Sequence, residues 1–211
     1  MSATAYAHRI EGRDLACWRG PAPLFRHVSF EASAGEWISI RGANGSGKTT
    51  LLRCVAGLTR ADEGSVVWDG QPTAADSQPY RGDLLYAGHL PGIKDDLSAE
   101  ENIEGALRLR GRAPSAQAVR AALAEVGLEK RRHLPARRLS AGQRRRIALA
   151  RLALDTATLW LLDEPLTALD DDGQALFTRL LRNHVDRGGI ALVATHQALA
   201  YPATREMRLG A

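Results

Sequence analysis

Short apolar runs separated by turn residues fill the first third of the chain, and this pattern predicts β-strands. Glycine, proline or aspartate stands at or near the ends of these runs, where strands usually turn. The runs are RDLACW at 13–18, LFRHVSFEA at 24–32, EWISIRG at 36–42 and GSVVWDG at 64–70. Two later runs, TLWLL at 158–162 and GIALVAT at 189–195, are apolar without alternation. The absence of alternation is typical of strands covered on both faces, as in a parallel sheet flanked by helices.

The middle of the chain predicts helices instead. Ser98 and Ser140 each stand three residues before a Glu or Gln, which is the capping-box pattern of a helix start. Between them, helical spacing over 115–128 places four apolar residues on one face, namely Val119, Ala122, Leu123 and Val126. The sequence therefore predicts an α/β fold with a helical insertion.

Composition places the chain among ordinary soluble globular proteins. Its 211 residues suit one domain, and its 45% hydrophobic and 25% charged residues allow a sizeable core. No apolar stretch approaches the roughly 20 residues needed to cross a bilayer, since Arg151 and Asp163 interrupt the longest runs. Residues 1–14 lack the apolar core of a signal peptide. We therefore expect a cytosolic protein, alone or docked to another component, in which Cys17 and Cys54 are reduced thiols and not metal ligands.

The net charge of +4 comes almost wholly from arginine, which gathers at 130–138 and 144–146. Such clusters can bind nucleic acid or acidic lipid. The alternative that we favour is a solvated face near a surface that handles phosphate groups. We accordingly expect no nucleic acid partner.

The segment GANGSGKT at 42–49 fits the pattern G-x-x-x-x-G-K-[ST] at every fixed position. It follows the strand-like WISIR and precedes an apolar-faced helix that ends near Gly57, which is the context that a phosphate-binding P-loop requires. Glycines let successive backbone amides point at phosphates, and the helix N-terminus adds positive potential. Lys48 is expected to reach the β and γ phosphates, and Thr49 to take one position on Mg²⁺. The predicted nucleotide-binding residues here are Gly42, Ala43, Asn44, Gly45, Ser46, Gly47, Lys48, Thr49 and Thr50.

A pair of carboxylates ends the buried run at 158–162. Asp163 is predicted to hold Mg²⁺, and Glu164 to orient and polarise an attacking water. The structural alternative is an acidic pair that merely caps a strand before a turn. With the P-loop present, we favour the catalytic interpretation.

Five motifs in order carry a resemblance to a known family: the P-loop, LSAGQ at 139–143, LLDEP at 161–165, TALD at 167–170 and ATH at 194–196. Together they resemble the nucleotide-binding subunits of ABC transporters over nearly the whole chain. The resemblance implies a P-loop NTPase fold of the ABC ATPase type in a single domain over 1–211. This fold has a RecA-like core, an antiparallel β sub-domain and an α-helical sub-domain at about 90–155.

The same resemblance implies a head-to-tail homodimer that encloses two ATP molecules. Each ATP would lie between the P-loop of one copy and the LSAGQ segment of the other, contributed by Ser140, Gly142 and Gln143. The tip of a helix with small residues can approach a γ-phosphate but cannot form a pocket alone. Asp170 resembles the aspartate that links the two sites across the dimer, with an N-cap role as the alternative. His196 resembles the histidine that contacts the γ-phosphate and the water, with a packed histidine as the alternative.

An aromatic residue upstream of the P-loop stacks on the nucleotide base in this family. Trp18, with Phe25 behind it, is the candidate in this chain. A tryptophan buried in the core is the competing interpretation.

His89 stands where the family usually carries a glutamine that contacts Mg²⁺ and the attacking water. It lies in LLYAGHLPGIKDD at 84–96, at the end of a predicted strand and in the loop that joins the catalytic core to the helical sub-domain. A neutral imidazole can donate and accept hydrogen bonds as a glutamine amide can. We favour a coupling and sensing role near the nucleotide, with a structural filler and direct haem contact as alternatives. A haem site would require an apolar pocket and further ligands.

Three stretches, LLYAGHLPGIK, SAGQRRRIALARL and WLLDEPLTALD, resemble the ATP-binding subunits of the haem exporter of bacterial cytochrome c maturation. That resemblance implies a peripheral subunit at the cytoplasmic face of the bacterial inner membrane. Its partners would be the integral membrane subunit CcmB, with CcmC, CcmD and the periplasmic haem chaperone CcmE. ATP hydrolysis would drive haem export or release of the haem-loaded chaperone.

Other functions remain as alternatives. The first is an ABC transporter ATPase for another substrate. A DNA-associated ABC-type ATPase is less favoured, because about 90 residues between Thr49 and Leu139 leave no room for its usual long insertion. Only one cassette is present, which disfavours a translation-associated protein, and the intact Lys48, Asp163, Glu164 and His196 disfavour a module that does not hydrolyse ATP.

Overall fold

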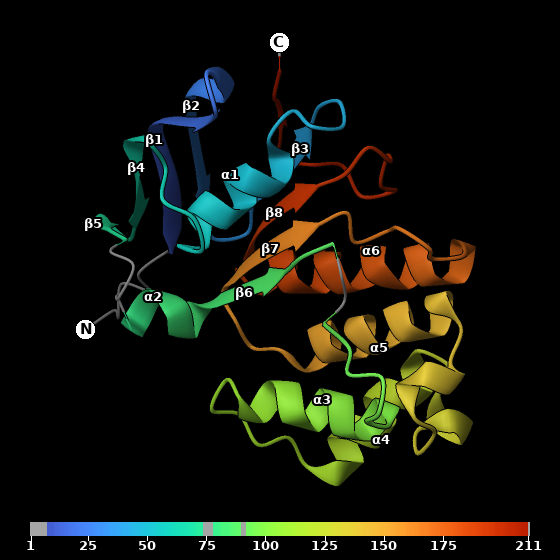
Figure 1. Cartoon of the computed structure of the whole chain (residues 1–211). Helices are drawn as coiled ribbons and strands as arrows, with labels where there is room; N and C mark the ends of the chain where they lie inside the picture. The colour runs from blue at the N-terminus through green and yellow to red at the C-terminus, as the bar shows by residue number, and fades with distance from the viewer. Residues whose placement is uncertain (1–7, 74–77, 90–91, 211) are drawn as a thin grey trace, which may run out of the picture. The chain divides into compact units, whose positions relative to one another are not determined.

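The computed structural model describes residues 8–73, 78–89 and 92–210 (Figure 1). Residues 1–7, which bear on the expected lack of a signal peptide, and residues 90 and 91 of the His89 loop lie outside these ranges. The chain divides into two compact units. One contains Met1–Ala87, Ala157–Pro165 and Arg182–Ala211, and the other contains Gly88–Thr156 and Leu166–Leu181.

An antiparallel sheet in the first unit contains three of the four early strands that the sequence predicted, those at 13–18, 24–32 and 64–70. Its order is β2-β1-β4-β5. The strands are β1 (Arg9–Arg19), β2 (Ala22–Ser33), β4 (Glu63–Trp68) and the short β5 (Gln71–Pro72). Irregularities in register interrupt the pairing of β1 with β2 between Gly12 and Trp18, as expected where a long strand bends.

A parallel sheet with the order β6-β7-β8-β3-β9 forms the rest of this unit's framework (Figure 1). Its strands are β3 (Trp37–Arg41), β6 (Leu84–Ala87), β7 (Leu159–Asp163), β8 (Ile190–Ala194) and β9 (Arg205–Arg208). The apolar runs predicted to be parallel strands, β7 and β8, lie side by side in its interior and are buried throughout. The edge strand β9 was not predicted, because its four residues are mostly charged and carry no apolar pattern.

Helix α1 (Lys48–Val55) packs in the main core of this unit. Its buried Leu51, Leu52 and Val55 share a cluster with Leu159 and Leu161 of β7. Because successive side chains of a strand point to opposite faces, Trp160 faces the other way. It stacks on His184, near the end of α6 (Asp171–Asp186), with ring centroids 3.9 Å apart. Both faces of β7 are thus covered within this unit.

The short α2 (Gln78–Asp83) precedes β6 and supplies Tyr80, whose hydroxyl donates a 2.5 Å hydrogen bond to the carbonyl of Val55. Cys17 and Cys54 are free thiols in the same core. Burial raises the pKa of Cys54 to about 12. Both side chains therefore act as apolar packing groups.

The second unit is helical, as predicted for the insertion. It contains α3 (Ala99–Arg108), α4 (Ala116–Glu125), α5 (Ala141–Leu154), the first part of α6, and two 3₁₀ turns at Glu129–Arg131 and Ala136–Arg138. Both predicted capping boxes are present, at Ser98 and Ser140. The predicted apolar face of α4 is buried, with Val119, Ala122, Leu123 and Val126 each at most 4% exposed. None of the helices that the structure describes has the length and hydropathy of a membrane-spanning segment.

Candidate functional site

The P-loop connects β3 to α1 and depends on glycine at defined places. Gly45 and Gly47 have φ values of 83° and 95°, in the left-handed region that favours glycine. A Cβ atom on Gly47 would also lie only 2.8 Å from Cδ1 of Phe25. These positions give the loop a tight curl directly before the N-terminus of α1, which is a favourable position for an anion.

Lys48 lies against this loop. Its side chain is largely buried, and Nζ donates hydrogen bonds to the carbonyl oxygens of Gly42 (2.7 Å) and Ala43 (3.0 Å). The residue is 7% exposed. The ammonium group is therefore held at the loop itself, where its charge can meet phosphate oxygens.

Thr49 and Asp163 lie side by side although 114 residues separate them. The Thr49 hydroxyl donates a 2.8 Å hydrogen bond to Oδ2 of Asp163, which is 2% exposed at the end of β7. Both are oxygen ligands of the kind that Mg²⁺ prefers. The described residues contain no cluster of three or more His, Cys, Asp or Glu able to hold a metal. The pair therefore fits Mg²⁺, which is commonly held by one or two protein oxygens together with substrate phosphates and water.

Glu164 and His196 meet at the ends of adjacent strands. Asp163 pairs with Ala194 in the register of β7 and β8, and Glu164 N–H donates to the carbonyl of Ala194 at 2.8 Å. Nδ1 of His196 lies 3.0 Å from Oε2 of Glu164. Glu164 has a φ of 50°, an uncommon backbone conformation for a residue with a side chain. The parallel sheet thus presents a carboxylate and an imidazole together at its carboxyl edge, where α/β folds usually bind ligands.

Trp18 is half-buried near the end of β1, and its backbone N–H donates to Oδ2 of Asp62 at 2.9 Å. Phe25, predicted to stand behind it, is 5% exposed and packs in the core of the same unit. Phe25 also contacts the place where a Gly47 side chain would project. Because Trp18 is only partly exposed, its burial does not distinguish base stacking from core packing, and both interpretations stay predictions.

Tyr86 was not singled out in the sequence. It lies near the end of β6, which is adjacent to β7. Burial and the nearby charge of Asp163 raise the pKa of the Tyr86 phenol above its ordinary value. Tyr86 is therefore a neutral hydrogen-bonding group near the Asp163 carboxylate. No sequence signal marks it beyond its place one residue before the end of a strand.

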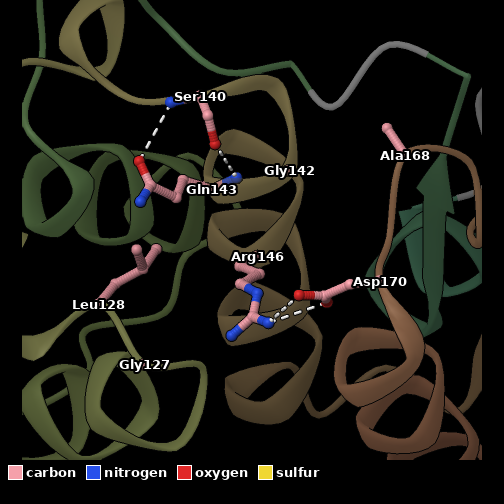
Figure 2. Close-up of a pocket in the computed structure, with 8 residues that line it drawn as sticks. All are labelled: Gly127, Leu128, Ser140, Gly142, Gln143, Arg146, Ala168 and Asp170. Atoms are coloured by element: carbon pink, nitrogen blue, oxygen red, sulfur yellow. Dashed lines mark hydrogen bonds and ion pairs between the residues drawn. The ribbon is translucent and has the colours of Figure 1, made fainter.

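Ser140, Gly142 and Gln143 belong to the helical unit and begin α5. Gln143 N–H donates to Ser140 Oγ at 3.2 Å, and Gln143 Oε1 accepts from Ser140 N–H at 3.1 Å (Figure 2). The Ser140 hydroxyl is exposed and keeps its own proton available for a further acceptor. A Cβ atom on Gly142 would lie 3.3 Å from the carbonyl oxygen of Ala168, so a small residue keeps this helix start close to the 166–170 segment.

Asp170 lies beside Ser140's helix in a cavity of about 380 Å³ (Figure 2). Arg146 donates to both of its carboxylate oxygens, at 2.8 and 2.7 Å. Gly173 N–H donates to Asp170 Oδ1 at 3.0 Å, which is the geometry of the N-cap alternative at the start of α6. The Arg146 hydrogen bond, with the Gly173 N–H, holds the pKa of Asp170 below its ordinary value. The role of Asp170 across a dimer stays a prediction.

His89 belongs to the helical unit, just beyond the end of β6. Its side chain is exposed and lines a cavity of about 430 Å³ together with Thr167 and Arg144. Its carbonyl accepts a 2.7 Å hydrogen bond from Nη1 of the buried Arg145. Among the residues that the structure describes, its imidazole has no hydrogen-bond partner. The backbone is therefore fixed while the imidazole remains available, and its role stays a prediction.

Residues 25–167 match the model of the ABC transporter family. Solved structures agree in fold. A putative ABC transporter ATP-binding protein from Pyrococcus furiosus superposes with a TM-score of 0.83 at 23% identity, covering 95% of this chain and 97% of that one. A dimeric ATP-binding cassette bound to ADP and Pi in a post-hydrolysis state gives a TM-score of 0.77 at 25% identity, covering 89% and 88%. The fold and the site are those of an ABC transporter ATPase.

Curated relatives narrow this class. The cytochrome c biogenesis ATP-binding export protein CcmA of Pseudomonas aeruginosa is 45% identical over 202 residues, covering 96% of this chain and all of the relative. The protein of the same name from Escherichia coli strain K12 is 46% identical over 200 residues, covering 95% of each chain. This chain belongs to the CcmA family of ABC ATP-binding proteins.

Proposed function

We propose that this chain binds and hydrolyses Mg²⁺-ATP to energise an export step in c-type cytochrome biogenesis. The observation that carries the proposal is the grouping, within one compact unit, of Lys48 at the P-loop, the Thr49–Asp163 hydrogen bond and the Glu164–His196 pair. The biological process comes from the names of the relatives, which are similar over almost the whole chain.

The residues from Gly42 to Thr50 bind the triphosphate. Backbone amides of the curled loop and the N-terminus of α1 receive the phosphate oxygens, and Lys48 neutralises their charge. Thr49 and Asp163 hold Mg²⁺, which supplies charge neutralisation of the phosphates when bound. Trp18 stacks on the base.

Glu164 is the group that orients and polarises water. Its left-handed backbone and the hydrogen bond from its N–H to Ala194 fix where the carboxylate lies. His196 holds that carboxylate through Nδ1 and presents the rest of its imidazole toward the γ-phosphate and the water. His89 supplies a second donor or acceptor in place of the family's usual glutamine.

Two copies of the chain act together as a head-to-tail homodimer. Ser140, Gly142 and Gln143 of one copy complete the ATP site of the other, and Asp170 links the two sites. This arrangement is supported by the exposed Ser140 hydroxyl at a helix N-terminus and by the dimeric state of a solved cassette of similar fold. Closure of the dimer then depends on ATP, because neither half-site is complete alone.

The chain works at the cytoplasmic face of the bacterial inner membrane as a peripheral subunit. Its membrane partner is CcmB, with CcmC, CcmD and CcmE in the same system. The ATP is used for haem export or for release of the haem-loaded chaperone. The arginines of the basic clusters are in part neutralised by acidic neighbours, as in the pairs Arg132–Glu100 and Arg144–Asp95, which favours a solvated face over a nucleic acid surface.

The test is the substitution Glu164→Gln. We expect ATP turnover to fall by about two to three orders of magnitude, because the carboxylate no longer accepts a proton from water. ATP binding should persist, and size-exclusion chromatography with ATP should show a trapped dimer. Glu206→Gln, a change of the same kind on the exposed edge strand β9, serves as control. Full turnover by a Glu164→Gln monomer would contradict both the assigned base and the dimer.

A further inference from the structure

The loop at residues 94–97 is firmly tied to helix α3. Asn102, which is 5% exposed, donates through Nδ2 to the carbonyl oxygens of Lys94 (3.0 Å), Leu97 (3.1 Å) and Ser98 (2.9 Å). Its Oδ1 accepts from Lys94 N–H at 2.7 Å. One buried amide therefore fixes the path of a loop whose side chains are exposed.

The same loop is joined by its backbone to the segment that leads into α5. Ala136 N–H donates to the carbonyl of Leu97 at 2.9 Å, and Arg137 N–H donates to the carbonyl of Asp95 at 3.0 Å. Loop 94–97 thus lies alongside residues 136 and 137, only three residues before Ser140.

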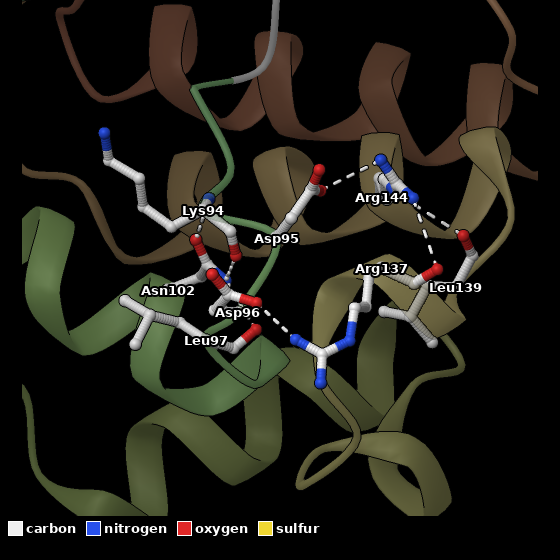
Figure 3. A network of polar contacts seen from close by, with 8 residues as sticks. All are labelled: Lys94, Asp95, Asp96, Leu97, Asn102, Arg137, Leu139 and Arg144. Carbon is white, nitrogen blue, oxygen red and sulfur yellow. Dashed lines mark hydrogen bonds and ion pairs between the residues drawn. The ribbon is translucent and has the colours of Figure 1, made fainter.

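Arg144 connects the loop to the residues directly before Ser140 (Figure 3). Its Nη1 donates to Oδ1 of Asp95 at 3.0 Å. Its Nε and Nη2 donate to the carbonyl oxygens of Leu139 (3.3 Å) and Arg137 (3.4 Å). The planar guanidinium has several donors in a fixed fork, so a carboxylate that orients one edge also orients the others.

A second arginine near Ser140, Arg137, also forms an ion pair with loop 94–97. Arg137 pairs with Asp96 in the same loop, but within the part of the chain that the structure describes its side chain makes no hydrogen bond to the carbonyls that precede Ser140 (Figure 3). Both pairs are exposed, with Asp95 at 60% and Asp96 at 88% side-chain exposure. Exposed pairs add little to stability, and the two carbonyl contacts of Arg144 are long. A contribution to stability therefore does not explain why the Arg144 side chain donates to three oxygens near Ser140, one from the Asp95 carboxylate and two from backbone carbonyls.

We propose that Arg144 is a positioning residue for Ser140, and that Asp95 sets the orientation of Arg144. The exposed loop 94–97 thereby controls how the N-terminus of α5 is presented. The inference rests on the proposed function, in which Ser140 meets the ATP of a second copy. Arg144 itself touches no reacting atom.

Hydrogen exchange tests the link without relying on ATP hydrolysis. The readout is exchange of the backbone amides of residues 139–143 in the full chain, including Gln143 N–H, which donates to Ser140 Oγ. We expect Arg144→Gln and Asp95→Asn each to accelerate exchange there about fivefold or more. Arg137→Gln, which removes the same charge from the same surface, should leave it within twofold. Equal acceleration by Arg137→Gln, or none by Arg144→Gln, would overturn the inference.

ATP turnover gives the functional readout. We expect Arg144→Gln and Asp95→Asn each to lower kcat about five- to tenfold with KM within twofold, because Ser140 acts in the closed state and not in initial ATP binding. The double variant should be no worse than either single one, since both remove one connection. Thermal midpoints should match that of Arg137→Gln. Additive losses, or losses that follow the fraction unfolded, would overturn the positioning role. The proposed function would instead be refuted if the wild-type protein did not hydrolyse ATP, or if the Glu164→Gln variant hydrolysed it at the wild-type rate. In either case hydrogen exchange would still decide the inference about Arg144.

Discussion

The imidazole of His196 lies 3.0 Å from the carboxylate of Glu164, with Nδ1 facing Oε2. The two residues are 32 positions apart in sequence but follow neighbouring strands, β7 and β8, whose carboxyl ends lie at one edge of the sheet. The hydrogen bond fixes one ring nitrogen at the carboxylate, so the other is free for a phosphate or a water.

His196→Ala should therefore impair the chemical step. We expect kcat to fall by about two orders of magnitude or more while ATP affinity changes only a few-fold, since Lys48 and the P-loop remain. Steady-state hydrolysis and equilibrium nucleotide binding measure the two effects. His27→Ala provides a control, because His27 is an exposed histidine that likewise pairs with a carboxylate, that of Asp14. Unchanged turnover in His196→Ala would leave His196 as a packing residue.

Two substitutions of Asp170 separate its role as the N-cap of α6 from the role of its negative charge. Asn is a good N-cap residue and can still accept from Gly173 N–H, whereas Ala cannot. We expect Asp170→Ala to lower the free energy of unfolding measurably, because the cap is lost, and Asp170→Asn to lower it much less. If Asp170 links two sites, both variants should weaken the ATP-dependent dimer. A normal dimer and normal turnover in Asp170→Asn would restrict this residue to capping α6.

His89 is tested by Ala and Gln variants. Because the imidazole is exposed and its backbone is held by Arg145, neither change should disturb folding. We expect His89→Ala to reduce turnover stimulated by the membrane partner about tenfold and His89→Gln to retain most of it, since an amide also donates and accepts. ATPase assays with and without the co-expressed membrane subunit measure this. Equal stimulation of all three proteins would make His89 a structural filler.

Gly189 is required by the packing of His184. A Cβ atom at 189 would lie 2.3 Å from the His184 ring, which stacks on Trp160. We expect Gly189→Ala to cost about 1 to 3 kcal/mol of unfolding free energy through overpacking, measured by urea denaturation. Gly105→Ala is the control, because that glycine lies within α3 with open space around its Cβ position. It should be neutral or stabilise by up to about 1 kcal/mol.

The buried Cys54 thiol should make stability depend on alkaline pH. Burial raises its pKa from 9.0 to about 12 in the folded protein, so the folded state keeps the proton more tightly than the unfolded state does. The contribution of the protonated Cys54 thiol to the free energy of unfolding is fully present below pH 9 and is lost as the pH rises from 9 toward 12. Wild-type stability should therefore fall relative to Cys54→Ala by about 1.4 kcal/mol per pH unit in this window. Parallel pH profiles of the two proteins would contradict the raised pKa.

Local sequence determined much of the fold. Non-alternating apolar runs predicted the buried strands β7 and β8, and both capping boxes predicted the starts of α3 and α5, because these signals act over a few residues. The edge strand β9 and the helix α6 were not predicted. The strand is short and charged, and the helix begins in the acidic run at 170–172, which lacks the Ser-x-x-Glu/Gln pattern that marked α3 and α5.

The candidate site shows the same division. The sequence by itself determined the glycine-rich loop, its lysine and the types of residue that follow each buried strand. Only the tertiary structure decided that Thr49 meets Asp163, that Glu164 meets His196, and that Arg144 joins Asp95 to the carbonyls before Ser140. The physical reason is distance along the chain. Apart from the local contacts of Arg144 with the carbonyls before Ser140, these contacts join residues from 32 to 114 positions apart, and only strand order and helix packing bring such residues together.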